Sequence, residues 1–278
     1  MNLADKRLKE LDNPSLTTEE RALLRCRVAA DLIHRGQYEA ARDALGELWR
    51  GIGQRPNLEG LGERATAEVL LQTGALSSWL GASRQVVGAQ EAAKDLISES
   101  IGLFGAAGDT ESVALARSNL ALCYWQTGAY DEARVLLADA LRGLTETSAR
   151  AKVLLRLTTV EFSAGRYNDA FDLLEEHAHI FDERVSHVVR GSFHNHLALV
   201  LKQLGTVEGR PDYLDRAIIE YTAAIHHLGE AGHDRYRATN ENNLANLLSK
   251  MGRHRQGMVS RLCARRVMPA LAPPEVAA

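Results

Sequence analysis

Two short groups of polar residues in this chain have types and spacings suited to holding another molecule. Lys152 and Arg156 stand four residues apart, so a helix would carry both cations on one face. An arginine and a lysine at one point suit a carboxylate, which the guanidinium binds through two parallel hydrogen bonds. Asn243 and Asn246 stand three apart, and paired amides can hydrogen-bond an extended peptide backbone. The alternative for the asparagines is a solvated face of a terminal helix.

Residues for metal or catalytic chemistry give weaker patterns. Of the ten histidines, His194 and His196 are two apart and fall on different helix faces, while the adjacent His226 and His227 cannot both face one ion. No HExxH or Cys/His spacing is present, and neither are GxSxG, GxxxxGK[ST] or GxGxxG. We therefore expect no metal site, no cofactor and no enzymatic activity.

Composition narrows the class of protein. The 278 residues carry a net charge of −3, whereas a nucleic-acid-binding protein usually has a strong basic excess, so a nucleic-acid partner is unlikely by this criterion. The three cysteines, Cys26, Cys123 and Cys263, lie far apart, which favours free thiols in a reducing compartment. Neither an 18-residue apolar run nor an apolar leader is found. We expect a cytoplasmic protein without a membrane segment.

The elements that position these residues are set by a repeat. A glycine recurs between two amphipathic helical stretches, as in CYWQTGAYDEA, and such a glycine can end a helix in the left-handed conformation. The spacings between successive glycines are 45, 47, 37, 40 and 47 residues, so six units of unequal length are predicted. The six glycines are Gly36, Gly81, Gly128, Gly165, Gly205 and Gly252.

Small residues flank each glycine at fixed distances. Seven residues before it stand Ala29, Gly74, Ala121, Ala198 and Ala245, with Thr158 as the outlier. Five residues after it stand Ala41, Ala133 and Ala170, but in the second and fifth units the alanine comes twelve residues after. Small residues allow paired helices to cross closely. The sequence therefore predicts antiparallel helix pairs, with a loop seven residues longer in those two units.

These features resemble the tetratricopeptide repeat. The segments YDEA and YNDA follow a turn glycine, and a small residue stands seven before it. The resemblance implies an all-α, right-handed superhelical solenoid of about six antiparallel helix pairs over residues 17–267. Residues 1–16 would form an N-terminal helix and linker, residues 268–278 a Pro/Ala-rich disordered tail, and Thr17 with Glu20 a capping box. The sixth unit departs from the pattern at His254, Gly257 and Arg261.

The resemblance also implies that the first helix of each unit lines a concave groove. Nine residues before the glycines stand Arg27, Gln72, Asn119, Arg156, His196 and Asn243, all of them polar. This row, with Lys152 and Asn246, is our candidate partner-binding surface; its alternative is a face that is merely solvated. Asn119, Lys152 and Arg156 are similar to half of a carboxylate clamp, whose other half falls on Leu71 and Ala75.

We therefore expect a non-enzymatic scaffold that binds a protein or peptide segment in its groove. Two alternatives stay open at this point. The chain could be the ligand- or peptide-sensing module of a larger bacterial regulator, or it could self-associate through a sixth unit that has no polar capping helix after it.

Overall fold

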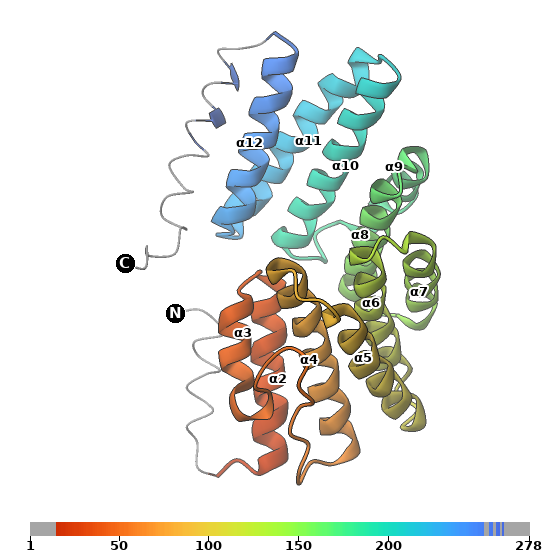
Figure 1. The fold of residues 1–278 in the computed structure, drawn as a ribbon. Helices are drawn as coiled ribbons and strands as arrows, with labels where there is room; N and C mark the ends of the chain where they lie inside the picture. The colour runs from red at the N-terminus through yellow and green to blue at the C-terminus, as the bar shows by residue number, and fades with distance from the viewer. Residues whose placement is uncertain (1–14, 253–255, 258–259, 262, 264–278) are drawn as a thin grey trace. The chain divides into compact units, whose positions relative to one another are not determined.

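The structure is a computed structural model that describes residues 15–252, 256–257, 260–261 and 263. Within those residues every regular element is a helix and none is a β-strand, so the predicted all-α fold is confirmed. Its helices form two compact units that divide between Thr145 and Glu146, and the colours of Figure 1 follow the helices in chain order. The predicted N-terminal helix, the tail and most of the sixth unit's second helix lie outside the described residues.

Unit 1 holds three antiparallel helix pairs. They are α2 (Thr18–His34) with α3 (Tyr38–Leu45), α4 (Glu63–Arg84) with α5 (Ala89–Ala106), and α6 (Thr110–Gln126) with α7 (Tyr130–Gly143). A 3-10 turn, η1 (Gly46–Leu48), follows α3. The first helices lie next to one another, since α4 packs against both α2 and α6. We call the surface formed by α2, α4 and α6 the inner surface of unit 1.

Unit 2 is also built from helix pairs. It holds α8 (Thr147–Ser163) with α9 (Tyr167–Glu176), the 3-10 turn η2 (Ala178–Ile180), α10 (His187–Val207) with α11 (Pro211–Glu230), and α12 (Asp234–Lys250). Helix α10 packs on α8 and α9 as well as on α11, and α12 packs on α11.

The start of α2 and the helix crossings follow the sequence pattern. Thr17 Oγ1 accepts a hydrogen bond from Glu20 N at 3.2 Å, and Thr17 N donates to Glu20 Oε2 at 2.9 Å, which confirms the capping box. The predicted crossing alanines are fully buried, among them Ala29, Ala41 and Ala133. Thr158, the outlier, is buried too, and its hydroxyl donates to Leu154 O at 3.0 Å. The outlier therefore fits the crossing without leaving a polar atom unpaired.

Two of the six glycines do not end helices, and that part of the prediction is wrong. Gly81 lies inside α4 and Gly205 inside α10, whereas Gly36, Gly128, Gly165 and Gly252 have the positive φ expected of turn glycines. Helix α4 ends at Gln85, a left-handed residue, and the turn after α10 contains Gly209 with φ of 66°. The longer loops of the second and fifth units are therefore largely an additional turn of the first helix.

Close packing explains the glycine at both positions. A Cβ on Gly81 would lie 2.3 Å from Ala89 Cβ, and one on Gly205 would lie 2.7 Å from Leu214 Cδ2. The absence of a side chain lets the second helix begin against the first, so these glycines serve the helix crossing.

Candidate functional site

The inner surface of unit 1 carries the predicted polar residues with one additional acid. Arg27 is exposed on α2, Gln72 is half-buried on α4, and Asn119 on α6 donates Nδ2 to Leu115 O at 2.9 Å. Glu68 stands four residues before Gln72, and burial raises its pKa against the opposing effects of a Gln72 hydrogen bond and the Arg64 charge. The surface therefore presents groups of different charge: a cation, uncharged amides and a carboxyl group.

Three aromatic rings line one end of the helix pairs in unit 1. Tyr38 stacks on Trp79 with ring centroids 5.5 Å apart and planes inclined by 9°. Trp79 in turn lies 6.4 Å from Trp125 at a tilted angle. All three residues are half-buried, so each contributes both to packing and to the surface. Because the rings come from α3, α4 and α6, they connect the three pairs.

The inner surface of unit 2 is richer in cations. Lys152, Arg156 and Thr159 lie on one face of α8, and Thr159 Oγ1 is 3.0 Å from His196 Nε2 on α10. Lys152 is exposed, while burial lowers the pKa of Arg156 to about 10. The pKa of His196 is also lowered by burial, so this imidazole is neutral at pH 7. We call Lys152, Arg156 and His196 the unit 2 inner surface.

Further along α10, Lys202 is a second partly buried cation. The pKa of Lys202 is lowered, first by desolvation and then by the positive charge of Lys250 on α12. Two ammonium groups that repel each other across neighbouring helices are stabilised by any anion that comes between them.

The acidic residues of the same helices are few, and each lies close to an arginine. Within their described spans, α8, α10 and α12 contain Glu161, Asp234 and Glu241 as acids. Glu161 is buried and forms an ion pair with Arg166, and Glu241 lies 3.8 Å from Arg237, which also holds Asp234 at 3.3 Å. The accessible charge of unit 2's first helices is therefore positive.

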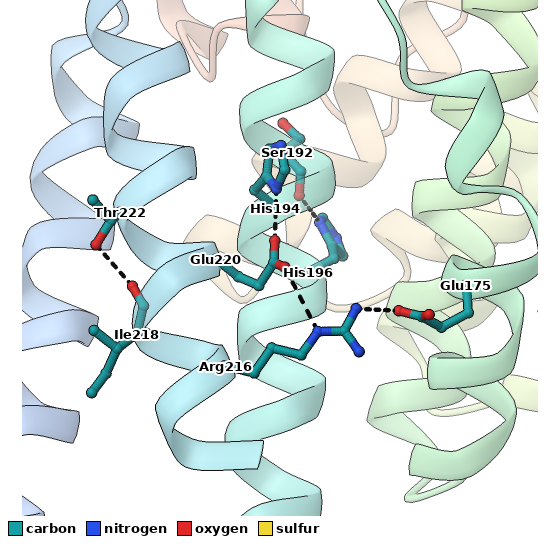
Figure 2. A network of polar contacts seen from close by, with 8 residues as sticks. All are labelled: Glu175, Ser192, His194, His196, Arg216, Ile218, Glu220 and Thr222. Carbon is teal, nitrogen blue, oxygen red and sulfur yellow. Dashed lines mark hydrogen bonds and ion pairs between the residues drawn. The ribbon is translucent and has the colours of Figure 1, made fainter. Parts of the chain in front are cut away.

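The two neighbouring histidines of α10 point in opposite directions, as their spacing predicts. His196 bonds Ser192 O at 2.7 Å and faces α8, whereas His194 Nδ1 contacts Glu220 Oε2 at 2.7 Å on α11. Figure 2 shows this second contact continuing through Arg216 to Glu175. Among the residues described, no group of three or more His, Cys, Asp or Glu could hold a metal ion.

A family model for the tetratricopeptide repeat matches residues 113–147, which contain most of α6 and all of α7. This match falls on the unit whose YDEA segment carries the resemblance. Residues 113–147 are therefore a tetratricopeptide repeat. No curated protein matches its sequence closely enough to be counted as a relative.

Solved structures with the same fold cover nearly the whole chain at low sequence identity. BtubC (BKLC) from P. vanneervenii aligns over 95% of this chain and 97% of its own, with TM-score 0.55 and 18% identity. A Rap protein complexed with Competence and Sporulation Factor aligns over 96% and 80%, with TM-score 0.54 and 12% identity. The human IFIT1 dimer with PPP-AAAA aligns over 92% of this chain but only 52% of its own, with TM-score 0.62 and 15% identity. These likenesses show the fold.

The remaining predicted residues of this repeat protein lie on α12. Asn243 is half-buried and Asn246 is exposed, and Asn246 Oδ1 accepts a long hydrogen bond of 3.4 Å from Arg261 Nη2. The half clamp stays a prediction, because Asn119 belongs to unit 1 whereas Lys152 and Arg156 belong to unit 2. Cys26 and Cys123 are buried free thiols, as predicted.

Sequence reasoning missed Glu68, the stacking of the aromatic rings and the pairing of the acids in unit 2. A signal for Glu68 existed, since it stands four residues before Gln72 on the same helix face. The pairing of Glu241 with Arg237 was also readable from their spacing of four, but the burial of Glu161 depends on tertiary packing.

Proposed function

We propose that this tetratricopeptide repeat protein binds a peptide or protein segment on the first helices of its repeats, and that the unit 2 inner surface takes an acidic segment. The observation that carries the proposal is Arg156, whose guanidinium is half-buried beside the exposed Lys152 and has a pKa lowered by burial to about 10. Burying a cation costs free energy, and a carboxylate ligand would offset that cost through charge-assisted hydrogen bonds.

Neighbouring groups support the same ligand class. His196 is neutral, and its two ring nitrogens contact Ser192 O and Thr159 Oγ1, so it holds α10 against α8 beside the two cations without adding a further charge. Asn243 and Asn246 on α12 supply amides that can pair with a peptide backbone. A Rap protein of this fold is complexed with Competence and Sporulation Factor, which shows that the fold can accommodate a bound factor.

The test uses the full chain and three synthetic peptides of equal length that are acidic, neutral and basic. We expect the acidic peptide to bind most tightly, with affinity that falls as salt is raised. Lys152→Ala combined with Arg156→Ala should weaken its binding by about tenfold to a hundredfold, the size expected for lost charge-assisted hydrogen bonds.

The matched control removes the same charge elsewhere. Arg134→Ala combined with Arg142→Ala changes two exposed cations on α7, a second helix, and should leave the Kd within a factor of about two because surface cations distant from a ligand contribute little. Equal affinity for the three peptides, or equal loss in both double variants, would count against the proposal.

A second candidate function is a sensing module in which ligand binding changes the helix packing. The fold shared with the Rap complex favours this alternative. Saturation with the acidic peptide would then slow hydrogen exchange in α8, α10 and α12 well beyond the residues it contacts, whereas a passive scaffold would show protection at those residues alone.

A further inference from the structure

Four histidine rings gather where α10 meets α11. His187 and His194 come from α10, and His226 and His227 from α11. The Nδ1 atoms of His187 and His227 are 3.1 Å apart, and the rings of His194 and His227 stack with centroids 5.4 Å apart and planes inclined by 18°. The His226 ring lies at the same centroid distance, 5.4 Å, from His227. His227 is thus surrounded by three other imidazoles, and we call these four residues the histidine cluster.

The contact between His187 and His227 requires a neutral ring. A hydrogen bond between two Nδ1 atoms needs one nitrogen to donate a proton and the other to accept it. If both rings become imidazolium, two N–H groups point at each other and two positive charges stand at hydrogen-bond distance. The contact therefore exists in full only when one of the two Nδ1 atoms carries a proton and the other does not.

Charged groups of both signs stand around the histidine cluster. Arg190 on α10 lies close enough to lower the pKa of His227, and its Nε is buried without a hydrogen-bond partner. On α11, Glu220 is the acid that faces the cluster; it binds His194 and lies 3.8 Å from Arg216, and Arg216 also binds Glu175 of α9 (Figure 2). The acid at the cluster is therefore already shared between two partners.

Helix α12, which packs on α11, brings a further arginine close to this end of the pair. A Cβ on Gly229 would lie 3.7 Å from Arg237 Cδ, and that guanidinium is balanced by Asp234 and Glu241 on its own helix. The groups of α12 thus add little net charge. The helix dipoles at the cluster oppose each other, because His187 begins α10 and His227 lies in the last turn of α11.

Tight packing prevents the charges from moving apart while the helices stay together. At Gly191, one turn after His187, a Cβ would lie 2.7 Å from Leu228 Cγ and 3.4 Å from Ala224 O. The two helices therefore approach as closely as a glycine allows, next to His227. Repulsion within the histidine cluster can then be relieved by separating α10 from α11 or by displacing the rings into solvent.

We propose that the histidine cluster is a proton-sensitive contact, which holds α10 against α11 at neutral pH and loosens this helix pair as the solution becomes acidic. Surrounding positive charge and burial both act in this direction: the pKa of His227 is lowered to about 4, first by desolvation and then by His194, Arg190, His187 and His226. The unfolded chain, with an ordinary histidine pKa of about 6.5, then binds more protons than the folded chain between these two values. Stability contributed by neutral His227 is present above about pH 6.5 and is lost as the pH falls towards 4.

The experiment measures amide hydrogen exchange of the full chain at pH 8 and pH 5, corrected for the intrinsic exchange rate at each pH. In α10 and α11 we expect the equilibrium constant for opening to rise by about tenfold to thirtyfold at pH 5, which follows from the displaced pKa of His227. Helices α6 and α7 of unit 1 are the internal reference. His227→Gln keeps a neutral polar side chain that does not titrate, so the rise should fall to a few-fold.

Two further variants make the result decisive. His187→Gln removes the opposite side of the 3.1 Å contact and should reduce the rise as well, even if His227→Gln folds poorly. His179→Gln changes an exposed histidine on η2 and should keep the full rise. The proposal is overturned if both cluster variants retain the whole acid-induced rise, or if α6 and α7 open as much as α10 and α11.

Discussion

At the scale of single residues, glycine has two different structural roles in this chain. Gly128 ends α6 with φ of 80°, a backbone conformation that residues with a Cβ rarely adopt. Gly81 lies inside α4, where its missing side chain admits the start of α5. The two uses have the same sequence context, a helix before and a helix after, and differ in whether conformation or space is limiting.

Replacing Gly81 tests the second use. In a helix interior, glycine to alanine usually stabilises by up to about 1 kcal/mol. At Gly81, however, the new Cβ would lie 2.3 Å from Ala89 Cβ, and overpacking of this kind costs about 1–3 kcal/mol. We expect Gly81→Ala to lower the free energy of unfolding in urea denaturation.

Gly102 supplies the matched control for this substitution. It lies in α5, is exposed, and would place its Cβ with nothing within 4 Å. Gly102→Ala should therefore stabilise the protein slightly, by up to about 1 kcal/mol. Stabilisation of the same size by both substitutions would contradict the role given to Gly81.

At the scale of helices, the sequence predicted which helices exist better than where they end. Buried residues such as Ala29 and Ala133 recur at spacings that only paired helices explain, so the pairs were readable. The ends of α4 and α10 are predicted wrongly, because the repeat pattern places a helix end at Gly81 and at Gly205. Whether a glycine ends a helix depends on the neighbouring helix, and a single sequence does not contain that information.

The candidate site divides in the same way. Lys152 and Arg156 lie on one helix face, as a spacing of four dictates. The contact between His187 and His227 joins residues forty apart, and no local spacing predicts it. Local periodicity therefore predicts which residues share one face of a helix. It does not predict which residues of two different helices contact each other.

The segment between α3 and α4 is an element that the repeat pattern did not describe. Trp49 follows η1, is buried, and donates its indole N–H to Gln54 O at 3.1 Å, while Asn57 N donates to Leu48 O at 2.8 Å. The ring belongs to the same core cluster as Val28 and Leu45. This residue therefore fastens the connecting segment to the first helix pair.

We expect Trp49→Ala to destabilise unit 1 by about 3–5 kcal/mol, because it removes a large buried side chain and leaves a cavity. Hydrogen exchange in α2 and α3 is the direct measurement. Trp49→Phe retains most of the volume but not the N–H donor, so its effect should be smaller, about 1 kcal/mol. If the two substitutions cost the same, the hydrogen bond rather than the packing would be the dominant contribution.

At the scale of the whole molecule, repeats give stability by stacking. One helix pair cannot bury its apolar face alone, and about three pairs are needed for an independent fold. Unit 1 has three pairs, with one core cluster that joins α2, α3 and α4 and another that joins α4, α5 and α6. Since α4 contributes to both clusters, unit 1 possesses a continuous core of its own.

A fragment of residues 15–145 should therefore fold by itself. We expect a helical circular dichroism spectrum and a single cooperative thermal transition, with the near-ultraviolet signal of Trp79 stacked on Tyr38 preserved. Shortening the fragment to residues 15–106 removes α6 and α7, exposes the apolar residues of α4 and α5 that α6 covers, and should abolish the cooperative transition. Because the two fragments share α2 to α5, the difference between them isolates the contribution of the third pair. A non-cooperative melt of the longer fragment would show that unit 1 requires unit 2 in order to fold.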